Sequence, residues 1–142
     1  MKTSILVPVD NSPTAQKTLG SIIELKYLFP KELTLLHVID DERMTSLVLP
    51  DFQREMFRLN ATQAGKLLLE QADERLCEAG FANDLLLEYG EPWRVISGIA
   101  NDRDFQLVVI GRHEGGGEFR DVVFGSVANH VMHNVKCPVL LF

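Results

Sequence analysis

Short, nearly continuous apolar runs alternate with longer segments of helical periodicity, and this alternation restricts the possible folds more than any other feature of the chain. The apolar runs cover residues 4–9, 33–39, 85–89, 105–110 and 139–142. Runs of this length are typical of strands buried on both faces, as in a parallel sheet. Helical spacing predicts helices over about 13–27, 51–79, 93–101 and from 126 onward. The sequence therefore predicts an α/β fold with helical crossovers, nearly all of them right-handed.

Helix start and stop signals support these boundaries. Ser12 is a good N-cap and Pro13 a good first helical residue. Gly80 is placed to end the long second helix. Within that helix, Gly65 lowers stability by up to ~1 kcal/mol relative to alanine, so we expect a bend or break there.

Length and charge exclude several classes of protein. The chain has 142 residues, which predicts one domain over 1–142. Its formal charge of −6 argues against non-specific binding of nucleic acid, which needs a basic surface. No apolar run approaches the ~20 residues of a membrane span, and the first run is too short for a signal peptide. With two cysteines and no disulfide framework, we expect a cytoplasmic protein without membrane or nucleic-acid partners.

Two features lie directly after predicted strands. Asp10 follows the first strand, and a glycine-rich segment over residues 111–126 follows the fourth. In open parallel sheets, ligands bind at the carboxyl ends of strands where the strand order reverses. If the fourth strand lies beside the first, as in the order 3-2-1-4-5, these two features meet.

The glycine-rich segment fits a phosphate site. Glycines allow backbone N–H groups to approach a ligand closely and to form a concave anion site. Gly125 and Ser126 would add the N-terminus of a helix, with its partial positive charge and a hydroxyl donor. The glycine content alone is also compatible with a surface loop followed by an N-capped helix, so both interpretations stand at this point.

Four segments together resemble the universal stress protein family, of the small single-domain type. They are residues 5–10 followed by Ser12, residues 35–38, the turn at 90–92, and the glycine loop that ends at 125–127 and precedes 137–140. The resemblance covers essentially the whole chain. It implies a Rossmann-like fold of the adenine nucleotide alpha hydrolase type: an open five-stranded parallel sheet, order 3-2-1-4-5, with helices on both faces. It also implies a homodimer and, in nucleotide-binding members, a stress-response regulatory role with ATP, ADP or AMP as ligand.

The loop departs from the family pattern Gly-x2-Gly-x9-Gly-Ser/Thr. The second glycine is expected at position 114, which is glutamate here. Counting back from Gly125, the x9 spacing reaches Gly115, so the loop is one residue longer than the pattern. Glycines at 115–117 let the backbone adapt, whereas Glu114 would repel phosphates unless it faces solvent. A decayed site in a stress or interaction protein is therefore the alternative function.

The resemblance assigns residue roles, each with an alternative. Asp10 contacts the ribose or a Mg²⁺ ion near the phosphates, or else caps the first helix. Pro8, Val9 and Val38 form an apolar slot for adenine, or simply belong to the core. Arg112 and Arg120 pair with phosphates, or else neutralise acidic side chains of the same loop. The full expected nucleotide-binding set is Pro8, Val9, Asp10, Val38, Gly111, Arg112, Gly115, Gly116, Gly125, Ser126 and Val127.

The sequence predicts no catalytic residue. Residues 111–126 contain no lysine and follow the fourth strand, so they are neither a P-loop nor a dinucleotide fingerprint. We therefore expect at most weak ATPase activity, with a phosphoryl-chemistry enzyme on the same fold as a further alternative. His130 and His133 have helical spacing but no third metal ligand, and His37 is expected to be a half-buried strand residue.

The last strand is expected at an edge of the sheet. In the order 3-2-1-4-5 it contains Val139, Leu140, Leu141 and Phe142, with no charge and no glycine. Unpaired N–H and C=O groups at such an edge attract another strand unless charge, proline or a cover protects them. We expect the same strand of a second copy to pair here about a two-fold axis.

Overall fold

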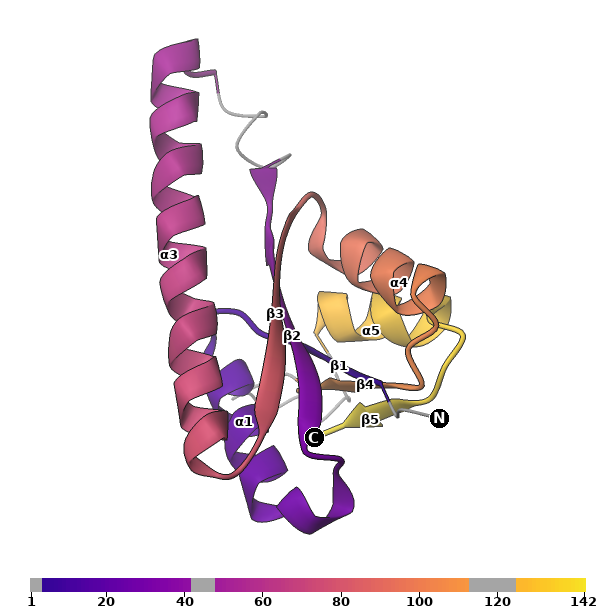
Figure 1. Cartoon of the computed structure of the whole chain (residues 1–142). Coiled ribbons are helices and arrows are strands. Elements are labelled where there is room, and N and C mark those ends of the chain that lie inside the picture. The colour runs from indigo at the N-terminus through magenta and orange to yellow at the C-terminus, as the bar shows by residue number, and fades with distance from the viewer. Residues whose placement is uncertain (1–3, 42–47, 113–124) are drawn as a thin grey trace, which may run out of the picture.

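The computed structural model describes residues 4–41, 48–112 and 125–142 (Figure 1). Strands and helices alternate along it as the apolar runs predict. The strands are β1 (Ile5–Pro8), β2 (Glu32–Ile39), β3 (Ala82–Tyr89), β4 (Leu107–Ile110) and β5 (Val139–Leu141). The helices are α1 (Pro13–Glu24), the 3-10 helix η1 (Lys26–Leu28), α3 (Asp51–Glu78), α4 (Pro92–Asp102) and α5 (Ser126–Asn134).

The five strands form one parallel sheet in the order β3-β2-β1-β4-β5, which confirms the predicted topology. The central strand is β1, where Leu6 lies opposite Thr34 of β2 and Val108 of β4. Chain order reverses between β1 and β4, because β2 continues the sheet to one side and β4 to the other. A ligand crevice is expected at the carboxyl ends of these two strands.

Alternating residues of the central strands belong to two separate hydrophobic cores. Val7 and Leu35 pack with α1 and α3 on one face of the sheet. Leu6 and Leu36 pack with α4 and α5 on the other face. All four side chains are fully buried, which explains why these strands are apolar throughout rather than alternating. Figure 1 shows the two helical layers on opposite sides of the sheet.

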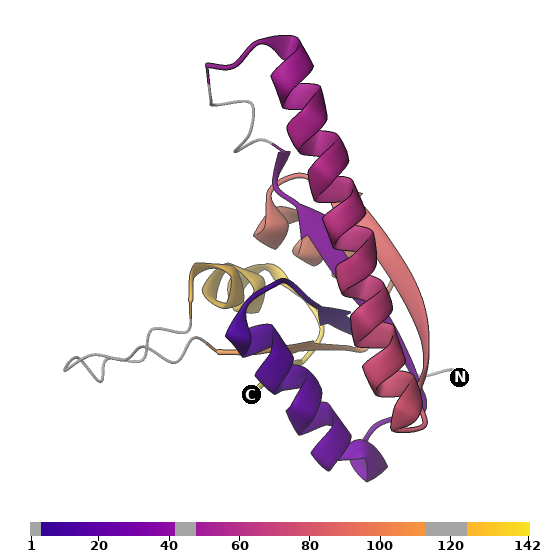
Figure 2. The ribbon, with the colours of Figure 1, turned by 90° about the vertical axis from the view of Figure 1, so that its left-hand side faces the viewer.

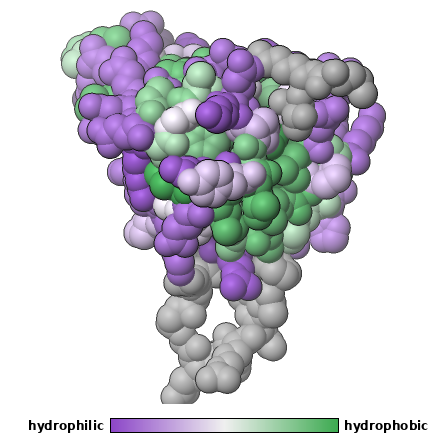
Figure 3. Space-filling view, turned by 60° about the horizontal axis from the view of Figure 1, so that its bottom comes forward, coloured by the Kyte–Doolittle hydropathy of each residue, from purple (hydrophilic) through white to green (hydrophobic). Residues whose placement is uncertain are grey.

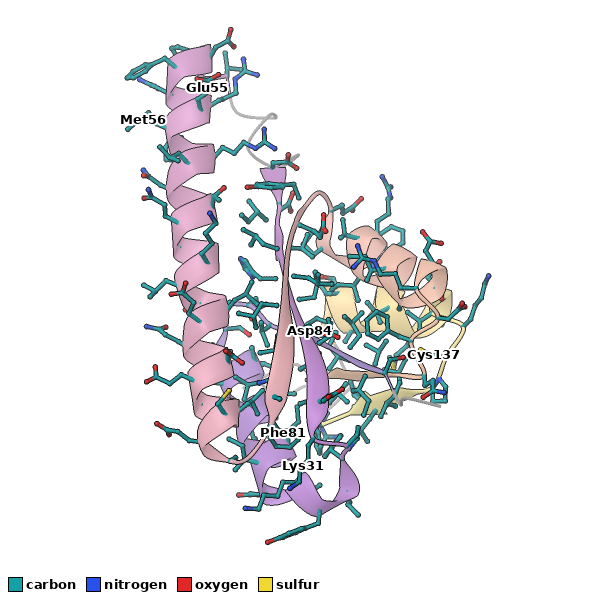
Figure 4. All side chains as sticks on the ribbon, in the orientation of Figure 1. Lys31, Glu55, Met56, Phe81, Asp84 and Cys137 are labelled. Atoms are coloured by element: carbon teal, nitrogen blue, oxygen red, sulfur yellow. The ribbon has the colours of Figure 1, made fainter. Side chains whose placement is uncertain are left out.

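The long helix α3 continues through Gly65 without the expected break. The glycine serves close packing instead. A Cβ atom at this position would lie 2.8 Å from Cδ2 of His37 and 3.0 Å from Cδ1 of Leu87. The first half of α3 extends past the carboxyl end of the sheet, with Met56 pointing away from it (Figures 2 and 4).

Alanine substitutions at two helical glycines should therefore have opposite effects. Gly98 lies inside α4, where an added Cβ would have no neighbour within 4 Å, so Gly98→Ala should raise the free energy of unfolding by about 0.5–1 kcal/mol. Gly65→Ala gains the same helix propensity but crowds His37 and Leu87 and should lower stability. Urea denaturation of both variants checks the contrast. Equal stabilisation by both would contradict the packing role of Gly65.

Some element boundaries differ from the prediction. Helix α1 ends at Glu24, and the exposed residues Lys26–Leu28 form the 3-10 helix rather than another α-helical turn. Strand β3 begins at Ala82, before the apolar run, because its eight residues pair in register with the eight residues of β2. Among the helices of the described ranges, none has the length and apolar character needed to cross a bilayer.

Candidate functional site

A cavity of about 540 Å³ opens at the carboxyl ends of β1 and β4, where the chain order reverses. This volume lies within the usual range for small-molecule sites. Its lining comes from β1 and the turn into α1, from the start of α1, from β2 and α4, from the end of β4 with Gly111, and from residues 125–128 at the start of α5. The lining residues are Pro8, Val9, Asp10, Ser12, Thr14, Ala15, Leu36, Val38, Pro92, Ile96, Ile110, Gly111, Gly125, Ser126, Val127 and Ala128.

The turn after β1 is held by two side chains. Oδ1 of Asp10 accepts a hydrogen bond from the amide of Ser12 at 2.8 Å. Oγ of Ser12 accepts one from the amide of Ala15 at 3.1 Å and caps α1, as the sequence predicts. Asp10 therefore does not cap the helix itself. One oxygen of its carboxylate stabilises the turn, and the exposed side chain also lines the cavity.

The N-terminus of α5 lies at the same cavity. Gly125 precedes the helix with φ of 78°, a left-handed conformation that favours glycine. Its carbonyl accepts from the amide of Asn129, so the amides of residues 126–128 have no partner within the helix. Ser126 is the first helical residue, and the N-cap residue Gly125 has no side chain that could cap the helix. Three amides and a hydroxyl thus stand at the positive end of a helix dipole, an arrangement suited to an anion.

Gly111 lines the cavity and also has a packing role. A Cβ here would collide with Oγ1 of Thr18 and would lie 2.5 Å from Cγ2 of Thr14. A glycine is therefore required at position 111, directly after β4, for the backbone to lie this close to α1. This contact also brings Thr14, on the first turn of α1, into the cavity wall.

Much of the remaining cavity lining is apolar. Val9, Leu36 and Ile110 are almost fully buried, and the half-buried Pro8 and Val38 join them. From α4, Pro92 and Ile96 complete the wall. These side chains give the cavity an apolar surface that suits an apolar group such as a purine ring.

Not every expected residue lines the cavity. Arg112 is exposed and absent from the lining, and its amide donates to the carbonyl of Phe142 at 2.8 Å. Gly115, Gly116 and Arg120 lie outside the described residues. Sequence reasoning missed Thr14, Pro92 and Ile96, because they reach the cavity only through the packing of α1 and α4 on the sheet. The Gly-Glu-Pro turn at 90–92 was a usable signal, since it places the start of α4 at a strand end.

His130 and the two cysteines do not line the cavity. His130 stacks on Trp93 with ring centroids 4.9 Å apart, and its Nδ1 donates to the Ser126 carbonyl. Within residues 4–41, 48–112 and 125–142, no group of three potential ligands is placed to hold a metal ion. Desolvation, and then Asp73, raises the pKa of the Cys77 thiol, and desolvation raises the pKa of Cys137. Both thiols therefore stay protonated near neutral pH.

Comparison with known proteins identifies the family. The model of the universal stress protein family matches residues 1–142. This chain belongs to the universal stress protein family. Universal stress protein YxiE of Bacillus subtilis is 28% identical over 147 residues, which cover 99% of both chains.

Solved structures of family members share the fold. The structure of MJ0577, a universal stress protein of Methanocaldococcus jannaschii, superposes with a TM-score of 0.82 at 28% identity and covers 99% of this chain and 95% of that one. A universal stress protein from Archaeoglobus fulgidus in complex with dAMP has a TM-score of 0.68 at 24% identity, with coverage of 99% and 97%. At that identity, the second likeness supports the fold alone.

Proposed function

We propose that this universal stress protein is a regulatory protein that binds an adenine nucleotide, ATP, ADP or AMP, in the cavity between β1, β4 and α5. The observation that carries the proposal is the polarity of that cavity. The lining combines the amides of residues 126–128, which have no partner within α5, with apolar side chains such as Val9, Val38 and Ile96. Phosphates fit the first and a purine fits the second. The Archaeoglobus fulgidus protein of the same fold was solved in complex with dAMP, which is itself an adenine nucleotide.

Each predicted contact has a physical role. The amides of Ser126 and Val127 donate to phosphate oxygens, and Oγ of Ser126 adds a further donor. Pro8, Val9 and Val38 enclose the base. Asp10 is the one acidic residue among the described lining residues, and a single carboxylate together with phosphate oxygens is a common way to hold Mg²⁺. Its carboxylate would hold that ion beside the phosphates or bond to the ribose.

We do not expect rapid hydrolysis of the bound nucleotide. Among the described lining residues, Asp10 is the only one with an acidic or basic side chain, and its Oδ1 already accepts a hydrogen bond from the amide of Ser12. No lysine or histidine of the described lining stands ready to move a proton. The nucleotide is therefore expected to act as an ordering ligand.

Co-purification and thermal shift test the proposal together. Mass spectrometry of the denatured protein should reveal an adenine nucleotide if one was retained. Added ATP with Mg²⁺ should raise the melting temperature, because a ligand at a hundredfold excess over its Kd stabilises the folded state by about 2.7 kcal/mol. A flat response at millimolar nucleotide would favour the alternative, a stress or interaction protein with a decayed site.

We further propose that β5 forms a homodimer. One edge of β5 pairs with β4, and no strand of the described chain pairs with its other edge. Its side chains are half-buried on both faces of the sheet, and Pro138 precedes the strand. Figure 3, which shows the lower side of Figure 1 where β5 and the C-terminus lie, has an apolar area bordered by hydrophilic residues. An antiparallel pair of β5 strands would satisfy the free edge.

Substituting one residue of β5 should break this dimer. Leu140→Lys introduces a charge at the pairing edge and should give monomers in sedimentation velocity at tens of micromolar protein. Leu28→Lys, at a side chain that is 77% exposed on η1, is the matched control and should stay dimeric. A wild-type monomer at that concentration, or a Leu140→Lys dimer, would rule out this interface.

A further inference from the structure

The ring of His37 reaches out of its own strand to the segment that follows β1. Nδ1 lies 2.9 Å from the carbonyl oxygen of Val9. Because a carbonyl only accepts, the hydrogen must be on Nδ1. On its other side, the amide of Val9 donates to the carbonyl of Leu36 at 2.8 Å. Both peptide groups of Val9 are therefore held by β2, although β1 itself ends at Pro8.

Val9 begins a short series of hydrogen bonds that builds the cavity wall. The next residue, Asp10, holds the amide of Ser12, and Ser12 holds the amide of Ala15. Val9, Asp10, Ser12 and Ala15 all line the cavity, whereas His37 does not. His37 thus holds Val9, the first of these lining residues, although His37 itself does not line the cavity.

The opposite edge of the ring rests on α3. A Cβ at Gly65 would lie 2.8 Å from Cδ2 and 3.3 Å from Nε2 of His37. A second hollow of about 510 Å³ between α3 and β2 is lined by His37 and Gly65 together with Asn11, which follows Asp10. The backbone of α3 at Gly65 therefore sets how far the ring can move away from Val9.

We propose that His37 is a positioning residue for the nucleotide site. It holds the Val9–Asp10 turn in the conformation that receives the ligand, and its own position is set by α3 at Gly65. Nucleotide affinity then depends on a contact between β2 and α3 that lies outside the cavity. The effect on affinity rests on the nucleotide-binding function proposed above, whereas the effect on the turn does not.

Two substitutions separate the hydrogen bond from simple packing. His37→Asn places an amide N–H near the position of Nδ1 but fills less space. His37→Leu fills the apolar space beside Gly65 and Leu87 but has no donor. If the ring only packs, leucine is the better replacement at this half-buried position. If Nδ1 positions Val9, asparagine is the better one.

The first measurement uses the protein without ligand. Amide hydrogen exchange at Ser12 and Ala15 should be about tenfold faster in His37→Leu, the loss expected from one hydrogen bond of about 1.4 kcal/mol. In His37→Asn it should stay within about threefold of wild type. In wild type, a long-range ¹H–¹⁵N NMR spectrum should place the hydrogen of the neutral ring on Nδ1. A hydrogen on Nε2 would overturn the proposal.

The second measurement is the Kd for AMP by calorimetry. His37→Leu should bind about tenfold more weakly than wild type, and His37→Asn within about threefold. Wild-type affinity and exchange in His37→Leu, or equal losses in both variants, would overturn the positioning role. If wild type binds no nucleotide, the proposed function fails, and amide exchange still decides whether His37 sets the turn.

Discussion

Replacing Gly125 by valine should abolish nucleotide binding while the sheet remains folded. Gly125 has φ of 78°, which a β-branched residue rarely adopts. Backbone strain of this kind amounts to about 1–3 kcal/mol, so the segment before α5 is expected to change conformation. The amides of residues 126–128 would then no longer converge at the cavity. Loss of these donors to a charged phosphate predicts an affinity at least about a hundredfold lower.

Ser126→Ala is the matched control for this prediction. It removes one hydroxyl donor from the same helix terminus and leaves the backbone unchanged. The expected loss is about 1 kcal/mol, or about fivefold in Kd, and somewhat more for a charged acceptor. Calorimetric titration with ATP and Mg²⁺ measures both variants, and circular dichroism confirms that they are folded. Wild-type affinity in a folded Gly125→Val protein would place the ligand away from α5.

Replacing Gly111 by alanine should destabilise the whole protein. The added methyl group would collide with Thr18, which is 3% exposed, and with Thr14 on the same helix. Neither neighbour can move freely, because Thr18 is buried and its Oγ1 donates to the carbonyl of Thr14 at 2.8 Å. Overpacking of this kind lowers the free energy of unfolding by about 1–3 kcal/mol. The melting temperature should therefore fall by several degrees, about 2–4 °C per kcal/mol for a chain of this size.

Gly98→Ala again provides the comparison, since it adds the same methyl group where there is open space. Thermal unfolding followed by circular dichroism should separate the two variants in opposite directions. A Gly111→Ala variant as stable as wild type would contradict the close contact of Gly111 with Thr14 and Thr18 of α1.

The order of the elements and the parallel sheet could be predicted because the central strands are apolar on both faces. Leu6 and Val7 belong to different cores, and only a sheet covered on both sides requires such consecutive apolar residues. The start of β3 was not predictable in this way. Asn83 is polar and resembles a loop residue, but it pairs with Leu33 and its side-chain amide donates to Asp73 of α3.

In the candidate site, too, residues placed by local sequence could be predicted, and residues placed by tertiary packing could not. Asp10, Gly125 and Ser126 were predictable because each lies at the end of a strand or the start of a helix, where local sequence determines geometry. Gly65 and Gly111 were not interpretable from the sequence, because their neighbours His37 and Thr18 come from distant elements. Sequence alone does not distinguish a glycine required by tertiary packing from one required by a ligand.

Direct titration of the purified protein with AMP, and with ATP and Mg²⁺, tests the central claim most directly. Isothermal calorimetry of wild type and Gly125→Val should be run at the same protein concentration, with circular dichroism to confirm folding. The account predicts a single saturable site in wild type and no measurable heat of binding in Gly125→Val. A folded wild-type protein, freed of any co-purified nucleotide, that shows no binding at millimolar AMP or ATP would contradict it.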